Sequence, residues 1–199
     1  ADLIIFNTCA VRGLAEHKAV SELGSTKKLK NKNPNIIVGM IGCVAQKLGK
    51  DLIKRYPFVD FILGTKDMYK ITEFLKTKDS EPIIKTDLDY EVSGFRSEKV
   101  KSVSAYLTVV RGCTNFCSYC IVPYVRGKEQ SRSVNEILDE VYALTENGVK
   151  EIVLLGQNVN IYGLDIGTNL ENLLVKINEI PKIKRIRYYQ IRKLMRLWI

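Results

Sequence analysis

The first third of the chain alternates short apolar runs with longer segments in which apolar and polar residues mix at helical spacing. Continuous apolar runs are typical of strands buried on both faces, as in parallel sheets. The pattern therefore predicts a parallel α/β sheet with right-handed crossovers. The expected strands are 3–7, 36–41 and 59–63, and the expected helices are about 14–31, 45–55 and 68–76.

Residues 77–103 break this rhythm. The segments 78–82 and 93–97 are polar and turn-like. Between and after them, Ile83-Ile84 and residues 100–103 have the composition of edge strands. We expect a linker here, with the domain boundary at its end.

A second strand–helix series follows the linker. Ser133 and Glu136 form a capping box, S-x-x-E, in front of an apolar helical face. The series predicts a βα barrel-like domain, whose active site would be built from loops at the carboxyl ends of its strands. The expected elements are strands 105–110, 151–155 and 183–188, a helix starting at the capping box, and a helix over 170–180.

The loop after the first strand of this second series carries three cysteines. Cys113, Cys117 and Cys120 are spaced C-x3-C-x2-C, so their thiolates can hold three corners of a cubane iron–sulfur cluster. The fourth iron is then left without a protein ligand, and an open position distinguishes a catalytic metal from a structural one. Zinc would need a fourth ligand near the loop, and none is visible. The spacing therefore favours chemistry at an iron.

The other two cysteines, Cys9 and Cys43, lie just past the first two expected strands. Ligands of open α/β sheets bind at that edge, so we interpret both as ligands of one site with a further ligand elsewhere. The alternative is that they are packing residues. The single histidine, His17, lies within the first helix, and we interpret it as surface or core rather than as a ligand.

The net charge of the chain indicates what kind of partner it binds, and its cysteine content indicates the cellular compartment. The 199 residues carry a formal net charge of +9 with a pI near 9.3, which fits a polyanion such as nucleic acid or, alternatively, a lysine-rich surface. Five cysteines, three of them tightly clustered, indicate reduced intracellular thiols that serve a metal. No apolar run approaches the ~20 residues of a membrane span. The chain has no signal-peptide pattern and does not begin with Met, so its natural start is expected upstream.

Around its cysteines the chain resembles the radical S-adenosylmethionine (radical SAM) methylthiotransferases. The motifs N-T-C-A-V-R at 7–12 and G-C-V-A-Q at 42–46 are similar to that family, and so is the run R-G-C…R-G-K-E…S-R at 111–132. The motif L-L-G-Q-N-V-N-x-Y-G at 154–163 resembles the branch that acts on isopentenyladenosine in tRNA. The resemblance extends from residue 1 to about 187.

The resemblance implies a 4Fe-4S cluster held by Cys113, Cys117 and Cys120. Its open iron would chelate S-adenosyl-L-methionine (SAM), whose reductive cleavage gives a deoxyadenosyl radical. Tyr119 is implied to lie against SAM, with local packing as the alternative.

Further SAM or RNA contacts are implied for polar residues near the same strand ends. Gln157 and Asn158 occupy the position that contacts the SAM amino group in the family, again with packing as the alternative. Arg126, Lys128 and Arg132 would meet SAM or the RNA backbone, unless they are merely solvated.

The resemblance also implies a second 4Fe-4S cluster, held by three cysteines of the first domain, that supplies the sulfur. Cys9 and Cys43 match two of these ligands, and the first is expected upstream of residue 1, so this cluster would be incomplete in the chain. The expected fold is α/β. It comprises an N-terminal methylthiotransferase domain at 1–77 (incomplete at its start), a linker at 78–103, the first part of a radical SAM βα partial barrel at 104–188 and a divergent tail at 189–199.

The implied function is a transferase that adds a methylthio group to carbon 2 of isopentenyladenosine next to the tRNA anticodon, although the chain alone is expected to be inactive. The alternatives are the branches acting on threonylcarbamoyl-adenosine tRNA or on a ribosomal protein, or a non-catalytic iron–sulfur or zinc fragment that binds RNA. The expected partners are a tRNA anticodon loop and an electron donor such as flavodoxin or ferredoxin. We expect a cytoplasmic monomer without a membrane segment.

Overall fold

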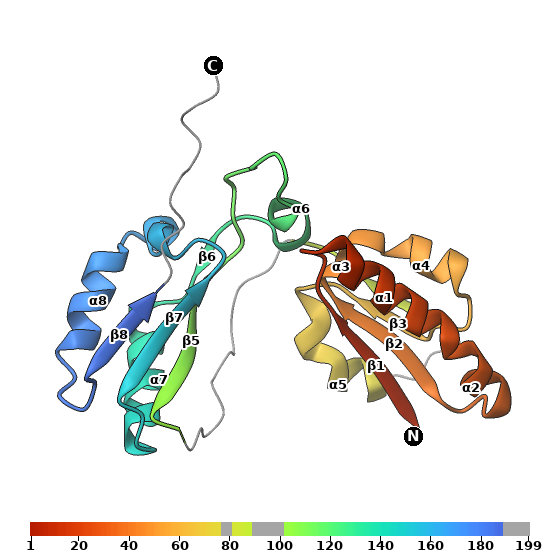
Figure 1. Ribbon diagram of the computed structural model, residues 1–199, viewed down its shortest axis with the longest axis horizontal. Coiled ribbons are helices and arrows are strands. Elements are labelled where there is room, and N and C mark those ends of the chain that lie inside the picture. Colours follow the sequence, from red (N-terminus) through yellow and green to blue (C-terminus); the bar gives the residue numbers. More distant parts are fainter. Residues whose placement is uncertain (77–80, 89–101, 189–199) are drawn as a thin grey trace. The chain divides into compact units, whose positions relative to one another are not determined.

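The computed structural model describes residues 1–76, 81–88 and 102–188 (Figure 1). The described residues belong to two compact units. The first comprises Ala1–Tyr90 with Asn115–Gly127, and the second comprises Glu91–Thr114 with Lys128–Ile199. The expected tail at 189–199 and the turn at 93–97 lie outside the described residues, as do parts of the segments 78–82 and 100–103.

The first unit contains the predicted parallel sheet, which confirms the expected strands and the edge strand at Ile83-Ile84. The strands are β1 (Leu3–Thr8), β2 (Ile37–Gly42), β3 (Phe61–Leu63) and β4 (Ile83–Lys85), in the order β1-β2-β3-β4. The connecting helices are α1 (Gly13–Ser25), α2 (Lys27–Lys32), α3 (Cys43–Leu48), α4 (Lys50–Arg55), the 3-10 turn η1 (Asp67–Lys70) and α5 (Ile71–Lys76).

Each of the three helices expected in the first unit is interrupted. The first divides at Thr26, whose hydroxyl donates to the Leu23 carbonyl at 2.6 Å and so competes with continued helix. The second divides at Gly49, whose φ of +43° ends α3. The third opens with the 3-10 turn η1 before α5 begins.

The core of the first unit lies mainly between its sheet and the helices α1, α3 and α4 (Figure 1). Helix α6 (Val122–Arg126) also contributes to this core, although it follows the three-cysteine loop in sequence. Val125 is 2% exposed there, and the Thr65 hydroxyl donates to its carbonyl at 2.8 Å. The buried residues of this cluster are Ala10, Val20, Leu23, Ile36, Val38, Met40, Cys43, Val44, Ala45, Leu52, Val59, Ile62 and Val125.

The second unit contains the second strand–helix series. Its strands are β5 (Ser104–Arg111), β6 (Gln130–Ser131), β7 (Glu151–Gly156) and β8 (Arg185–Tyr188), in the order β6-β5-β7-β8. Strands β5, β7 and β8 run parallel, as expected, and β6 is an unpredicted antiparallel addition. The helices are α7 (Val134–Glu146), α8 (Leu170–Asn178) and the 3-10 turns η2 (Val159–Ile161) and η3 (Leu164–Ile166).

The Ser133 half of the predicted capping box is confirmed at the start of α7, where the Ser133 hydroxyl accepts from the Glu136 amide at 3.3 Å. The Glu136 carboxylate accepts from Arg132 Nε at 3.1 Å. The apolar face of α7 packs against β5 and β7 together with α8. The fully or nearly fully buried residues of this core include Leu107, Val109, Ile137, Val141, Leu144, Ile152, Leu154, Leu173 and Ile177. No helix in the described ranges is long and apolar enough to cross a membrane.

Gly42, the last residue of β2, provides a test of the strand end that leads into α3. Its φ is +93°, and a Cβ would lie 2.6 Å from the Thr8 carbonyl oxygen. We expect Gly42→Ala to destabilise the first unit by about 1–3 kcal/mol, because both strain and a backbone clash oppose it. Gly13→Ala is the matched control, since a Cβ there meets nothing within 4 Å. Urea unfolding followed by circular dichroism measures both, and equal midpoints would contradict the expectation.

Candidate functional site

Cys9 and Cys43 directly follow residues that pair across the sheet. Thr8, at the end of β1, is opposite Gly42, at the end of β2, so the two cysteines occupy equivalent positions at one sheet edge, as expected. Cys9 is exposed, whereas Cys43 is 4% exposed at the first position of α3. The Thr8 hydroxyl donates to the Ile41 carbonyl at 2.7 Å and accepts from the Val44 amide at 3.2 Å, which holds the second strand end in place.

The three-cysteine loop begins where β5 ends. Cys113 is 8% exposed and Cys117 and Cys120 are partly exposed; none of the three forms a disulfide. The Cys120 amide donates to the Cys117 carbonyl at 2.8 Å. Between the first two cysteines, Phe116 has a φ of +45°, the only positive φ of a non-glycine residue in the described ranges. Such a conformation is uncommon for a bulky side chain and marks a tightly turned loop.

The backbone on each side of Cys113 is held by a side chain. The Gly112 amide donates to Gln157 Oε1 at 2.8 Å. The Thr114 amide donates to Glu129 Oε1 at 2.6 Å, and the Thr114 hydroxyl lies 2.9 Å from both Glu129 oxygens. Gln157 therefore reaches the cysteine loop, while Glu129 was not predicted as a site residue.

The other predicted contact residues differ in exposure. Tyr119 is 86% exposed. Arg126 is half-buried at the end of α6, and Lys128 is exposed. Asn158 is 6% exposed, immediately before η2. Nothing in the geometry assigns a ligand contact to these four, so their binding roles stay predictions.

Arg132 was expected to meet SAM or RNA, and this expectation is wrong. Its side chain is 1% exposed and forms ion pairs with Glu136 at 3.1 Å and with Glu140 at 2.7 Å. Its Nη1 donates to the Thr108 carbonyl of β5 at 3.0 Å. The guanidinium therefore links β5 to α7 inside the second unit, where neither RNA nor SAM reaches it.

Tyr162 extends this buried network. Its side chain is fully buried, and its hydroxyl donates to the Arg132 carbonyl at 2.8 Å. Burial, with a smaller contribution from the Asp165 carboxylate, raises the pKa of Tyr162 to about 12. The phenol therefore stays protonated and serves as a hydrogen-bond donor.

The donor set of the loop fits an iron–sulfur cluster. Within the described residues, no three or more cysteine, histidine or acidic side chains are gathered in the arrangement of a metal site. The ligand assignment rests on chemistry instead, because Cys113, Cys117 and Cys120 are undisulfided thiols, and thiolates select iron–sulfur clusters or zinc.

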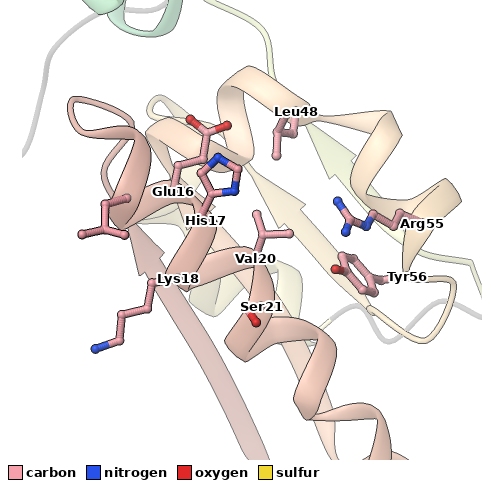
Figure 2. Close-up of a pocket in the computed structure, with 9 residues that line it drawn as sticks. Glu16, His17, Lys18, Val20, Ser21, Leu48, Arg55 and Tyr56 are labelled. Carbon is pink, nitrogen blue, oxygen red and sulfur yellow. The ribbon is translucent and has the colours of Figure 1, made fainter.

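A separate groove of about 780 Å³ lies on the first unit between α1 and the ends of α3 and α4. Figure 2 shows Val20 in the middle of its lining, Tyr56 and Arg55 on one side and Lys18 directed away. His17 lines it as an exposed residue of α1, which agrees with the first of its two expected positions, surface or core. None of the predicted site residues lines this groove.

Two segments of the chain match known protein families. Residues 1–64 match the uncharacterized protein family UPF0004, and residues 107–192 match the Radical SAM superfamily. The chain is 47% identical over 196 residues to the tRNA-2-methylthio-N(6)-dimethylallyladenosine synthase of Caldicellulosiruptor saccharolyticus, covering 94% of this chain and 42% of that protein. Proteins of the same name from Clostridium tetani and Dictyoglomus thermophilum are 47% and 42% identical, again over 94% of this chain and 43% and 44% of theirs. The chain thus spans less than half the length of these relatives.

A solved structure shares the fold. It is the radical S-adenosylmethionine methyltransferase TsrM from Kitasatospora setae, with a tryptophan substrate and a SAM analogue bound. The TM-score is 0.55 at 14% identity, covering 92% of this chain and 43% of that one. This likeness confirms the expected α/β fold class.

The buried position of Arg132 leads to a stability prediction. Arg132→Ala leaves the Glu140 carboxylate, 5% exposed, without its cation, and we expect a loss of about 3–5 kcal/mol. Arg185→Ala is the control, because its ion pair with Glu151 is 61% exposed on the arginine side and should cost at most about 1 kcal/mol. Thermal unfolding distinguishes the two. The double variant Arg132→Met/Glu140→Leu should recover most of the loss, and its failure to do so would contradict the charge-based explanation.

The raised pKa of Tyr162 predicts that the stability of the protein depends on pH in alkali. Because its folded pKa, about 12, lies above the ordinary value of 10.0, its contribution to stability is complete below pH 10 and is lost as the pH rises through about 12. Tyr162→Phe should remove this part of the dependence, whereas Tyr106→Phe, at a mostly exposed ring, should not. Urea midpoints measured across this range, with tyrosinate absorbance, provide the measurement. A buried tyrosine that titrates together with the exposed ones would overturn the assignment.

Proposed function

We propose, because residues 107–192 match the Radical SAM superfamily and residues 1–64 match the UPF0004 family, that the chain forms part of a tRNA methylthiotransferase. The reaction is the addition of a methylthio group to carbon 2 of isopentenyladenosine next to the anticodon. One observation carries the proposal: a C-x3-C-x2-C loop follows β5 in a chain 47% identical to a protein named tRNA-2-methylthio-N(6)-dimethylallyladenosine synthase.

The chemistry of the target bond supports a radical enzyme. A C–H bond of an adenine ring is unactivated, so a general acid or base has little effect on it. Cys113, Cys117 and Cys120 would hold a 4Fe-4S cluster, with SAM at the open iron. When bound, this cluster supplies the electron for reductive cleavage of SAM.

Protein groups around the loop would bind and orient SAM. The largely exposed ring of Tyr119 is available to lie against the cofactor. Gln157 and Asn158 come directly after β7, next to the strand that leads into the loop. Arg126, half-buried at the end of α6, would contribute a positive charge towards SAM or RNA phosphate.

The first unit would carry a second cluster. Cys9 and Cys43 follow paired strand ends, which suits two ligands of one group, and a third ligand would come from outside residues 1–199. The corresponding domains are 1–77 for the methylthiotransferase part, 78–103 for the linker, 104–188 for the radical SAM part and 189–199 for a divergent tail.

The net charge supports an RNA substrate. At +9, the chain attracts phosphates, and the bases of single-stranded anticodon loops are splayed out for recognition. A tRNA substrate implies a cytoplasmic location. The electron would come from a donor such as flavodoxin or ferredoxin, and the protein would act as a monomer.

The proposal predicts different effects for the two groups of cysteines. After anaerobic reconstitution with iron and sulfide, and addition of SAM and dithionite, Cys117→Ala should abolish deoxyadenosine formation, because a cluster ligand is lost. In the full-length protein that contains this chain, Cys43→Ala should retain deoxyadenosine formation but fail to thiolate an anticodon stem-loop that carries isopentenyladenosine. Mass spectrometry of the released nucleosides measures both products.

Two controls complete this experiment. His17→Ala, at an exposed residue of α1 that belongs to neither group of cysteines, should leave both products unchanged. Bound zinc with no deoxyadenosine in the unaltered protein would overturn the radical mechanism in favour of a zinc module. Thiolation of threonylcarbamoyl-adenosine RNA instead would reassign the substrate.

A further inference from the structure

The two peptide amides that flank Cys113 are each bound by an oxygen of a side chain far away in sequence. Gly112 N–H donates to Gln157, and Thr114 N–H donates to Glu129. We propose that Glu129 and Gln157 are positioning residues, which fix the first thiolate of the three-cysteine loop and keep these two amides from the sulfur atoms of a cluster. The presence of a cluster rests on the proposed function. The two hydrogen bonds that Gln157 and Glu129 accept on either side of Cys113, called the clamp below, do not depend on it.

Both clamp residues are placed by the strands on either side of β5. The sheet order is β6-β5-β7. Arg111, at the end of β5, pairs with Gln130 of β6, so Glu129 lies one residue beyond this pair. On the other side, Val110 pairs with Gly156 of β7, so Gln157 also lies one residue beyond its pair. The two side chains therefore reach the same loop from the ends of the two strands that pair with β5.

Gly156 allows the approach on the β7 side. A Cβ at this residue would lie 2.5 Å from Val110 Cγ1 and 3.0 Å from the Val110 carbonyl oxygen. Any side chain would push the end of β7 away from β5. The absence of one keeps Gln157 within reach of Gly112.

The Glu129 contact is stronger than an ordinary turn contact. A carboxylate that accepts from both an amide and a hydroxyl forms charge-assisted hydrogen bonds, which are shorter and about twice as strong as neutral ones. The 2.6 Å distance between Thr114 N and Glu129 Oε1 agrees with this. The contact also places a negative charge one residue from Cys113. Negative charge and fewer N–H donors to sulfur both favour the oxidised state of a cluster and lower its reduction potential.

A similar contact nearby provides a matched control. The Ser131 amide donates to Asp165 Oδ2 at 2.7 Å. This contact has the same donor and acceptor types and lies in the same unit, but it does not touch the cysteine loop. Replacing Asp165 therefore removes a hydrogen bond of the same type that does not itself contact the cysteine loop.

The first experiment uses metal-free, reduced protein and measures the alkylation rate of each cysteine by peptide mass spectrometry. Glu129→Ala and Gln157→Ala should each raise the rate at the buried Cys113 about tenfold relative to Cys9 in the same molecule, because a hydrogen bond that closes the segment is lost. Asp165→Ala should leave the ratio unchanged. A wild-type ratio in both clamp variants overturns the proposal.

The second experiment separates positioning from charge through the conservative variant. Glu129→Gln retains an acceptor oxygen but loses the charge, so it should restore most of the protection of Cys113 and the wild-type iron content. It should still raise the midpoint potential of the reconstituted cluster in a redox titration followed by electron paramagnetic resonance. Alkylation as fast as in Glu129→Ala would overturn the positioning role, and an unchanged potential would overturn the charge effect. If no cluster forms in the unaltered protein, the proposed function fails, while the alkylation rates still decide the clamp.

Discussion

Parallel strand pairing is the constraint on which the chemistry of this chain depends. In a parallel pair, the residues that follow both strands emerge at the same edge, so positions distant in sequence become neighbours. The pair Thr8–Gly42 brings Cys9 and Cys43 to one edge of the first unit. The pair Val110–Gly156 brings the start of the three-cysteine loop and Gln157 to one edge of the second. In each unit, the register of two hydrogen-bonded strands thus decides which side chains can act together.

Short-range sequence patterns predicted the elements whose formation depends on residues that are close in sequence. The apolar runs gave the parallel strands, and the S-x-x-E box gave the start of α7, because strand burial and helix capping both leave a short-range mark in the sequence. The helix α6 was missed, because its five residues are too few to show a helical periodicity in the sequence. Its buried position depends on Val125 filling a gap between elements of the first unit more than fifty residues earlier in sequence. No periodicity in the sequence encodes such a contact.

The burial of Arg132 could have been predicted from the sequence of α7. Charged residues are rarely fully buried, so Arg132 was expected in solvent or on a ligand. Glu140, however, lies on the same helical face as Ile137, Val141 and Leu144, all of them buried. A carboxylate within an apolar face requires a buried cation. Arg132, just before the helix, is the nearest candidate in sequence, and the structure pairs them at 2.7 Å. The contact of Glu129 could not be predicted from the sequence in this way, because its partner Thr114 is fifteen residues away on a loop.

The buried arginine also determines how the second unit opens. Its guanidinium joins β5 to α7, its amide donates to the Val109 carbonyl, and its own carbonyl accepts from Tyr162. Opening at this point would break all of these bonds together and expose a charged network, so small local fluctuations cannot release it. The amide of Arg132 should therefore exchange its hydrogen for deuterium only through the largest opening of the unit. The segment that returns from the cysteine loop is thus fixed to the part of the second unit that opens last.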